Sequence, residues 1–283
     1  MLSSAARARL TVVLVGARNP SNIGAAARAL HDFGFTSLRI VNDFAAPFEA
    51  AQIEASQLEN SAAVAAHSVL QSARRFDTLA DAIADCALVV GTTAIGAREL
   101  TQPVLPLQLA APIILNALSV PPSKPYPLSP VPSVALLFGS EKTGLTNDQL
   151  SHCGLLTTIP MFAPKALATE SGEAVQKPLR HLSMNLGQSV AVCLYELTRD
   201  GFEDATEAPA AHEAPATAAD RERLTQLLLD VMHATGYTRR FPANATAPLV
   251  RQLALQLGTS HREAMTWMGI LRQVLWKVVG SKL

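Results

Sequence analysis

Three stretches of the sequence combine Asn, Ser, Glu, Arg and Gly in patterns that could bind and orient a polar ligand. In residues 19–28, an Asn-rich turn leads into Ile23, Gly24 and three consecutive alanines before Arg28. Small residues at the start of a helix let another surface approach the helix N-terminus, where backbone N–H groups suit a phosphate or a ribose. A tight turn with a small-residue packing face would give the same pattern, so both interpretations stay open.

The second stretch, residues 138–145, places Glu141 and Lys142 between Gly139 and Gly144. It is not a phosphate-binding Walker loop, because the lysine precedes the second glycine instead of following it. No Gly-x-Gly-x-x-Gly follows the first predicted strand, which disfavours a generic dinucleotide-binding enzyme. A carboxylate between two glycines suits hydrogen bonding to a polar ligand group. An exposed glutamate on an ordinary surface turn is the alternative.

The third stretch has two parts, the apolar residues 159–161 and residues 181–191. Residues 162–180 lie between the two parts. Ser183 and Asn185 lie there at the start of a predicted helix. Both residue types can hydrogen-bond a ligand, and both are also common helix N-caps. Taken alone, this stretch therefore indicates a helix start as readily as a binding loop.

The elements that must position these stretches alternate between strands and helices. Short β-branched apolar runs predict buried strands, and apolar residues at three- and four-residue spacing predict helices. The predicted strands are 10–15, 38–41, 88–93, 134–138 and 156–161. Helices are predicted from 21 to before 34, at 49–57, 59–69, 79–84 and 107–118, after a cap at Thr146, and at 184–197, with a proline-rich loop at 121–132. This alternation predicts an α/β domain, residues 1–199, with a mostly parallel sheet covered on both faces.

The charge distribution predicts a second domain. The chain has 283 residues and no net charge, and residues 1–199 carry 14 basic and 14 acidic side chains. Residues 200–220 carry six acidic side chains and no Lys or Arg, and with few large apolar residues they predict a flexible linker. Residues 221–283 carry nine basic and three acidic side chains, a net of +6, in helical patterns at 221–235, 247–257 and 260–279. A basic helical domain suits RNA, although a solvated basic face without a partner is the alternative.

The remaining composition argues against a metal site, a disulfide framework and a membrane protein. Cys86, Cys153 and Cys193 are widely spaced in apolar surroundings, which predicts buried, inert thiols in a reducing, cytoplasmic setting. The seven histidines show no ligand spacing. The longest apolar runs are strand-sized, and the first residues lack the apolar core of a signal peptide.

In chain order the three stretches read Asn-Pro-x-Asn-Ile-Gly-x-x-x-Arg, Phe-Gly-x-Glu-x-x-Gly-Leu, and Ile-Pro followed by Ser-x-Asn. This set resembles the three motifs of the SpoU/TrmH family of SPOUT methyltransferases, over roughly residues 10–197. Tyr-Glu-Leu at 195–197, the Val-Gly-Thr-Thr segment and the small helical domain look most like the TrmJ branch. The resemblance implies a SPOUT α/β knot: a parallel sheet flanked by helices, with a deep C-terminal trefoil knot, followed by a small all-α C-terminal domain. Such a knot is an exception to the general absence of knots in proteins.

The same resemblance implies an activity and its partners. It implies S-adenosylmethionine-dependent methylation of a ribose 2′-hydroxyl in RNA, at nucleotide 32 of the tRNA anticodon loop. It also implies a homodimer whose active site is completed across the interface. Two alternatives are an enzyme that acts on ribosomal RNA or another tRNA site and, from a different class, an RNA chaperone that binds the cofactor without catalysis.

The motifs also imply roles for individual residues. Arg28 is the implied catalytic group, and the residues that shape the site around the ribose and the methyl donor are Asn22, Glu141, Ser183 and Asn185. The implied cofactor contacts are Thr92, Thr93, Ala94, Gly139, Gly144, Leu145, Ile159, Met161, Leu182, Ser183 and Met184. A guanidinium normally stays protonated, so Arg28 acts either as the base that the family proposals assign or as a group that orients the 3′ phosphate.

The chain departs from the family between Met161 and Ser183. About twenty residues stand where most relatives have a few. A mobile lid over the cofactor, an inert insertion, and an extra RNA contact through Lys165, Lys177 and Arg180 are all compatible with the composition of residues 162–180.

Overall fold

The computed structural model describes residues 2–41, 45–57, 61–94, 102–119, 133–161, 184–199 and 214–280. Within these residues the centre is a seven-stranded sheet in the order β3-β2-β1-β6-β4-β7-β5, and every pairing is parallel. The strands are β1 (Leu10–Val15), β2 (Ser37–Val41), β3 (Arg74–Phe76), β4 (Cys86–Thr92), β5 (Val104–Pro106), β6 (Ser133–Phe138) and β7 (Leu155–Thr158).

Strand β1 shows why the sheet is covered on both faces. All six of its residues are buried, and five of them are Leu or Val without polar alternation. Parallel strands covered on both sides have this composition. Successive side chains point to opposite faces, so Val12 and Leu14 belong to one apolar core and Val13 and Val15 to the other.

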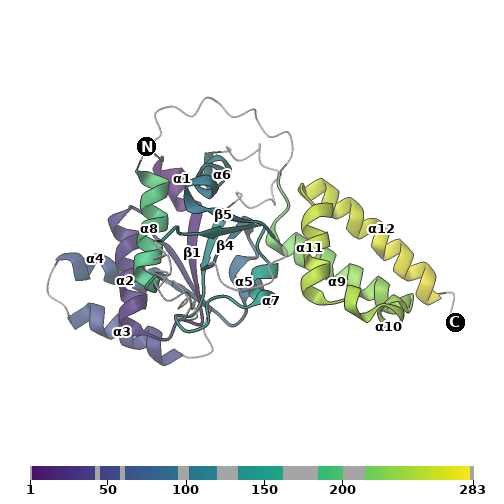
Figure 1. Ribbon diagram of the computed structural model, residues 1–283, viewed down its shortest axis with the longest axis horizontal. Coiled ribbons are helices and arrows are strands. Elements are labelled where there is room, and N and C mark those ends of the chain that lie inside the picture. The colour runs from purple at the N-terminus through teal and green to yellow at the C-terminus, as the bar shows by residue number, and fades with distance from the viewer. Residues whose placement is uncertain are drawn as a thin grey trace, which may run out of the picture.

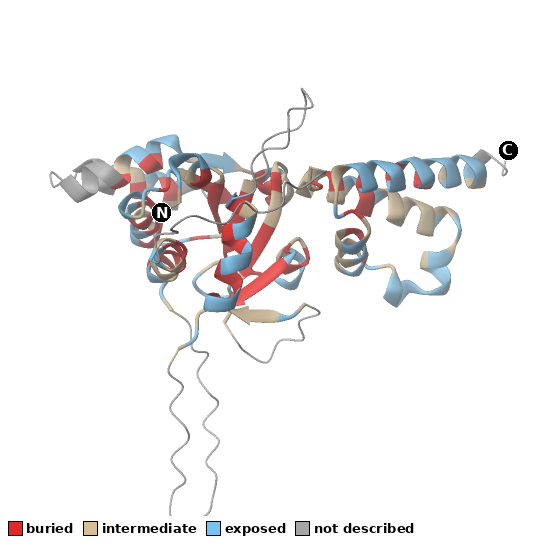
Figure 2. Cartoon of the chain, turned by 90° about the horizontal axis from the view of Figure 1, so that it is seen from above, coloured by how far each residue is buried: buried red, intermediate tan, exposed pale blue. Residues whose placement is uncertain are grey.

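Helices form a layer on each face of the sheet (Figure 1). The helices of the larger layer are α1 (Ser4–Ala8), α2 (Pro20–Asp32), α3 (Ala45–Gln57), α4 (Ser61–Ser72), α6 (Leu107–Ser119) and α8 (Leu186–Thr198). On the other face lie α5 (Leu79–Ile83) and α7 (Asn147–Ser151). Figure 2 shows the buried residues concentrated in the strands and on the inward sides of the helices. The predicted α/β architecture is therefore confirmed.

A separate group of helices follows at the C-terminal side and lies beside α5 and α7 (Figure 1). Its elements are α9 (Ala218–Ala234), α10 (Tyr237–Arg240), a 3₁₀ turn (Pro242–Asn244), α11 (Ala247–Leu257) and α12 (His261–Gly280). Leu224 of α9, Ala254 of α11 and Met268 of α12 meet in its small apolar core. We refer to residues 214–280 as the helical domain.

Two strands, the short helices α1 and α10, and one domain boundary differ from the sequence expectation. Strands β3 and β5 were not expected, because each has only three residues. A run as short as Arg-Arg-Phe is too short to show the two-residue period of a strand. Helix α9 begins at Ala218 and not at Arg221, so residues 218–220 do not belong to the linker. The reason is a capping box, in which Thr217 accepts from the amide of Asp220 and the Asp220 carboxylate accepts from the amide of Thr217.

Several expectations fall on residues that the structure does not describe. The proline-rich loop at 121–132, the insertion at 162–180 and linker residues 200–213 all lie outside the described ranges. The trefoil knot depends on how the chain runs from β7 to α8, through residues 162–183, and it therefore stays a prediction.

The three cysteines are buried free thiols, as the sequence predicts. Burial raises the pKa of the Cys86 and Cys193 thiols to about 12, and it raises the pKa of Cys153 as well. In the part of the chain that the structure describes, no group of three or more His, Cys, Asp or Glu side chains could hold a metal ion. No described helix combines the length and apolar character needed to cross a membrane.

Candidate functional site

The three sequence stretches meet at one edge of the sheet. Strands β6, β4 and β7 are neighbours, and because they are parallel their carboxyl ends lie together, where α/β sheets usually bind ligands. A cavity of about 600 Å³ opens there. Its walls are formed by Asn22, Thr92, Thr93, Ala94, Phe138, Gly139, Ser140, Glu141, Lys142, Thr143, Gly144, Leu145, Thr158, Ile159, Met161, Met184, Asn185, Leu186 and Ser189.

Glu141 joins the first stretch to the second. Its carboxylate accepts hydrogen bonds from the backbone amides of Arg18 (3.2 Å) and Asn19 (3.3 Å). It also accepts a bond of 3.0 Å from the side-chain amide of Asn22. Two of these donors are backbone N–H groups of the turn that leads into α2, and the third is a side chain in the first turn of the helix. The glutamate therefore holds the Asn-rich turn against the loop that follows β6.

Asn22 joins the first stretch to the third. It is buried, and its Oδ1 accepts a hydrogen bond of 2.8 Å from the side-chain amide of Asn185. Asn185 is at the same time the N-cap of α8, because its Oδ1 accepts from the amide of Gly187 at 2.9 Å. The helix-cap interpretation of Asn185 is confirmed, and the same side chain also lines the cavity, since its oxygen serves the cap and its nitrogen bonds to Asn22.

The electrostatics of Glu141 follow from these contacts. Burial raises the pKa of the carboxyl, but the hydrogen bonds from Asn22, Arg18 and Asn19 outweigh burial, and the pKa lies below its ordinary value. A carboxylate with a lowered pKa and three donors is a weak proton acceptor. Glu141 is therefore suited to holding the loops together and poorly suited to acting as a general base.

Two glycines shape the wall that residues 139–145 provide. A side chain at Gly139 would place its Cβ 2.1 Å from the backbone carbon of Gly144, so only glycine permits this close approach. Gly144 has a φ of +67°, a left-handed conformation that glycine adopts at little cost. The two glycines bring Leu145 to the cavity and let Thr146 cap α7 with a capping box.

The loop after β4 closes another side of the cavity. The Thr92 hydroxyl donates to the carbonyl of Leu137 at 2.8 Å, and the amide of Thr93 donates to the carbonyl of Thr157 at 2.9 Å. These bonds tie the end of β4 to both neighbouring strands. The backbone at residues 92–94 is therefore held in a fixed conformation at the rim.

The structure brings most of the implied site residues to this cavity. Those that line it are Asn22, Glu141, Asn185, Thr92, Thr93, Ala94, Gly139, Gly144, Leu145, Ile159, Met161 and Met184. Leu182 and Ser183 lie outside the described residues. Seven further wall residues were not among the predicted site residues: Phe138, Ser140, Lys142, Thr143, Thr158, Leu186 and Ser189. The first six each adjoin a predicted residue, and Ser189 lies one helical turn after Asn185.

Arg28 is not part of the cavity wall in this chain. Its side chain is 59% exposed and its Nε lies 3.6 Å from a carboxylate oxygen of Asp32, one turn further along α2. Six residues separate Arg28 from Asn22, which is roughly 240° around a helix, so the two side chains leave α2 in different directions. The sequence motif contains both residues, but the helix separates them.

The cavity suits a nucleoside that carries a short polar chain. Its volume falls within the range of about 300–1,000 Å³ that is typical of small-molecule and cofactor sites. Leu145, Ile159 and Met161 offer apolar surface for a flat ring, and threonine hydroxyls and backbone groups offer hydrogen bonds. Such a mixture of apolar walls and a few convergent polar groups fits S-adenosylmethionine.

Comparisons with known proteins agree with this geometry. The sequence profile of the SpoU rRNA Methylase family matches residues 9–166, which include the first two stretches and β1, β4, β6 and β7. The chain is similar to the tRNA (cytidine/uridine-2′-O-)-methyltransferase TrmJ of Sodalis glossinidius, with 30% identity over 94% of this chain and 91% of that protein. It is also 30% identical to TrmJ of Cronobacter sakazakii, over 96% of this chain and 97% of the relative.

Two solved structures share the fold. The structure of TrmJ from Z. mobilis ZM4 matches 93% of this chain and 98% of its own, at 28% identity and a TM-score of 0.65. A probable methyltransferase from Bordetella pertussis Tohama I covers 69% of this chain and 97% of its own, at 26% identity and a TM-score of 0.52. The first of these likenesses extends over the helical domain as well as the sheet.

Proposed function

The chain belongs to the SpoU rRNA methylase family, and from this premise we propose that it transfers a methyl group from S-adenosylmethionine to a ribose 2′-hydroxyl of tRNA, at nucleotide 32 of the anticodon loop. The observation that carries the proposal is the hydrogen-bonded chain Glu141–Asn22–Asn185, which joins the three motif loops around one cavity. The TrmJ relatives, which this chain matches along almost their whole length, are named as tRNA methyltransferases. Their names support tRNA as the substrate.

The residues of the cavity bind and orient rather than react. S-adenosylmethionine, when bound, supplies an activated methyl group on its sulfonium centre. The apolar side chains of Leu145, Ile159 and Met161 would shield the bound cofactor from water, and the fixed backbone at residues 92–94 and 139 would provide directional hydrogen bonds. Asn22 and Asn185, held by each other, orient polar groups at the mouth of the cavity.

We assign to Arg28 the role of a cation that contacts the RNA. Because a guanidinium stays protonated, it binds a phosphate next to the target ribose and stabilises negative charge that develops on the ribose oxygen. Its exposed place on α2, outside the cavity wall of its own chain, supports a role toward an incoming molecule. The proton leaves to a phosphate oxygen or to water.

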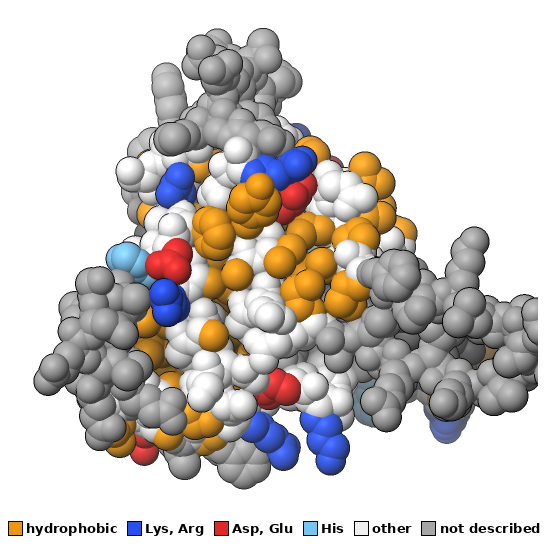
Figure 3. All heavy atoms as spheres, turned by 60° about the vertical axis from the view of Figure 1, so that its left-hand side comes forward, with side chains coloured by type: hydrophobic (Ala, Val, Ile, Leu, Met, Phe, Trp, Pro, Cys, Tyr) orange, Lys and Arg blue, Asp and Glu red, His pale blue; other side chains and the backbone are white. Residues whose placement is uncertain are grey.

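A second copy of the chain completes the proposed site. The side of the molecule that carries α2 and α8 is largely apolar or uncharged, with scattered charged side chains (Figure 3). Tyr195 of α8 is 53% exposed there, and a Cβ at Gly24 of α2 would meet no atom within 4 Å. An apolar face with room for a close approach supports a homodimer through this domain, which would bring Arg28 to the partner's cavity.

The helical domain provides the proposed RNA-binding surface. Its exposed basic residues are Arg223, Arg239, Arg240, Arg262, Arg272 and Lys277. Tyr237 and Phe241 are exposed beside two of them, with ring centroids 5.1 Å apart. Arginines interleaved with exposed aromatic rings suit single-stranded RNA, whose bases stack on such rings. In this proposal the protein works on tRNA in the cytoplasm.

The test is a methyl-transfer assay on total tRNA and ribosomal RNA with labelled S-adenosylmethionine, followed by mapping of the ribose methylations. We expect label in tRNA at nucleotide 32. Label only in ribosomal RNA, or at another tRNA position, would overturn the substrate assignment and leave the activity intact. Binding of cofactor and RNA without any transfer would favour the RNA chaperone instead.

A further inference from the structure

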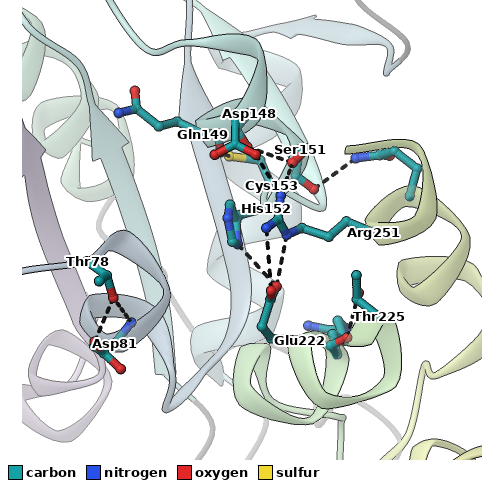
Figure 4. A network of polar contacts seen from close by, with 12 residues as sticks. Thr78, Asp81, Asp148, Gln149, Ser151, His152, Cys153, Glu222, Thr225 and Arg251 are labelled. Carbon is teal, nitrogen blue, oxygen red and sulfur yellow. Dashed lines mark hydrogen bonds and ion pairs between the residues drawn. The ribbon is translucent and has the colours of Figure 1, made fainter. Parts of the chain in front are cut away.

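Arg251 of α11 lies where the helical domain meets the sheet and its helices, residues 2–199, which we call the methyltransferase domain, and it contacts both domains. Its Nη1 donates to a carboxylate oxygen of Asp148 at 2.8 Å and to the hydroxyl of Ser151 at 3.0 Å, both on α7. Its Nε donates to the carboxylate of Glu222 on α9 at 2.9 Å. Figure 4 shows the guanidinium enclosed between these two carboxylates. One side chain therefore joins α11, α9 and α7.

Further hydrogen bonds cross the same boundary. The side-chain amide of Gln252 donates to the carbonyl of Ser151 at 3.0 Å, and the amide of Ala219 donates to the carbonyl of Ala84 at 3.0 Å. Since the last carbonyls of a helix have no partner within it, these bonds satisfy groups at the ends of α7 and α5. The helical domain is thus hydrogen-bonded to the methyltransferase domain at several points.

Arg221 adds a contact to the central sheet. The register of β4 shifts between Cys86 and Leu88, and the carbonyl of Ala87 at this irregularity accepts a hydrogen bond of 2.8 Å from the guanidinium of Arg221. A bulge leaves backbone groups outside the strand ladder. The Arg221 side chain of the helical domain provides the hydrogen-bond donor for this carbonyl. The surfaces of the two domains are therefore complementary at this point.

The elements that the helical domain contacts, β4 and α7, are directly connected to residues of the cavity wall. Strand β4 ends at Thr92, and α7 follows Gly144 and Leu145 of the cavity wall, with only the capping residue Thr146 between. The contacts at Ala87 and Asp148 are therefore a few residues away from the proposed cofactor site. Contacts at these positions therefore set the orientation of the helical domain relative to the proposed cofactor site.

We propose that Arg251 is a positioning residue that fixes the helical domain in one orientation, so that RNA bound to this domain meets the cavity in the correct register. This inference rests on the proposed function, because it assumes an RNA substrate. The Arg251 side chain is only 15% exposed and bonds to α7 and α9 at once, so its removal breaks the ion pairs with Asp148 and Glu222 together and weakens the docked arrangement. Without Arg251 the bonds at Ala84, Ala87 and Ser151 remain, but the domain is held less firmly and samples a wider range of orientations.

The test combines an inter-domain distance with enzyme kinetics. Gln108→Cys on α6 and Gln273→Cys on α12 place spin labels on exposed positions of the two domains. The native cysteines are buried with raised pKa values, so labelling is selective. Labelled chain is mixed with excess unlabelled chain, and the distance distribution is measured in the parent, in Arg251→Met, in Arg251→Lys and in Arg272→Met. Arg272 is exposed in the same domain, so its variant is the control for the effect of removing a positive charge on the distance distribution. It is not a control for the KM, because Arg272 belongs to the proposed RNA-binding surface.

We expect a narrow distance distribution in the parent and in Arg272→Met, a broad one in Arg251→Met, and an intermediate one in Arg251→Lys. The KM for tRNA should rise roughly tenfold in Arg251→Met, with kcat and the Kd for S-adenosylmethionine almost unchanged, because only the registration of the RNA is lost. An unchanged distribution would overturn the proposal whatever the kinetics, and so would a broad distribution with an unchanged KM. If the parent transfers no methyl group to RNA, the proposed function fails, while the distances still decide whether Arg251 fixes the domain.

Discussion

The side-chain amide of Asn185 donates a hydrogen bond of 2.8 Å to Oδ1 of Asn22, 163 residues earlier in the chain. Asn22 in turn donates to Glu141, so its single amide group connects the second and third motif loops. An amide can do this because it carries a donor and an acceptor on opposite atoms. Neither aspartate nor leucine, which are similar in size, could replace both functions.

Asn22→Ala should therefore destabilise the protein and abolish methyl transfer. It leaves the amide of Asn185 without its acceptor and removes the side-chain donor to Glu141, at an expected cost of about 1–3 kcal/mol. Asn19→Ala is the matched control, because it removes only the cap of α2. Chemical denaturation and the transfer assay measure both variants. Normal transfer by the Asn22 variant would contradict the role of this connection.

The lowered pKa of Glu141 makes part of the stability depend on pH. The native state favours the carboxylate more than the unfolded chain does, so Glu141 stabilises the fold above its ordinary pKa, near 4.5. This contribution is lost as the pH falls through the lowered value. In Glu141→Gln the contribution is absent, so the parent and the variant should differ at neutral pH and converge in acid. Parallel stability curves down to low pH would show that Glu141 does not hold the loops through its charge.

Much of the fold and of the site was predictable, because local patterns encode both. The six-residue run of β1 and the glycine-bounded loop 139–144 each carry their structure in adjacent residues. The clustering of the three stretches followed from the rule that parallel strands end at the same edge. The identity of the acceptor for Asn185 was not predictable, because a hydrogen bond across 163 residues leaves no pattern in the sequence.

Charge shows the limit of sequence reasoning most clearly. The nine basic residues of 221–283 look like one RNA-binding set. In the structure Arg221 and Arg251 are turned toward the methyltransferase domain, so only some of the others are available to RNA. Composition gives the net charge of a segment, but burial and pairing depend on the tertiary fold.

Arg28→Ala should lower the rate of methyl transfer by roughly 10²-fold or more, because it removes a cation that stabilises the transition state. Its side chain is 59% exposed and its one ion pair is on the surface, so the free energy of unfolding should change by less than about 0.5 kcal/mol. The Kd for S-adenosylmethionine should not change, since Arg28 lies outside the cavity wall. Asp32→Ala breaks the same ion pair, keeps the guanidinium and should stay active. Full turnover by Arg28→Ala on tRNA would refute its assignment.

Gly24→Ala and Gly187→Ala should have opposite effects on stability. A Cβ at Gly24 meets nothing within 4 Å, and alanine in a helix is favoured over glycine by roughly 0.5–1 kcal/mol. A Cβ at Gly187 would lie 2.5 Å from the Cβ of Ala25, so that variant should be destabilised by the collision of α8 with α2. If a second chain approaches α2 at Gly24, the stabilised variant should nevertheless dimerise more weakly, which sedimentation measures. An unchanged dimer would place the interface elsewhere.

His152 should make the docking of the helical domain sensitive to pH. Burial lowers the pKa of this imidazole, as does the charge of Arg251, and together they outweigh the opposite effects of Glu222 and Asp148. The docked state therefore favours the neutral ring, and this stability is present above the ordinary histidine pKa of about 6.5 and is lost as the pH falls below it. The distance distribution between labels on α6 and α12 should accordingly broaden between pH 7.5 and about 5.5. His152→Gln cannot be protonated, so its distribution should stay the same over this range; equal broadening in both proteins would assign the effect to another group.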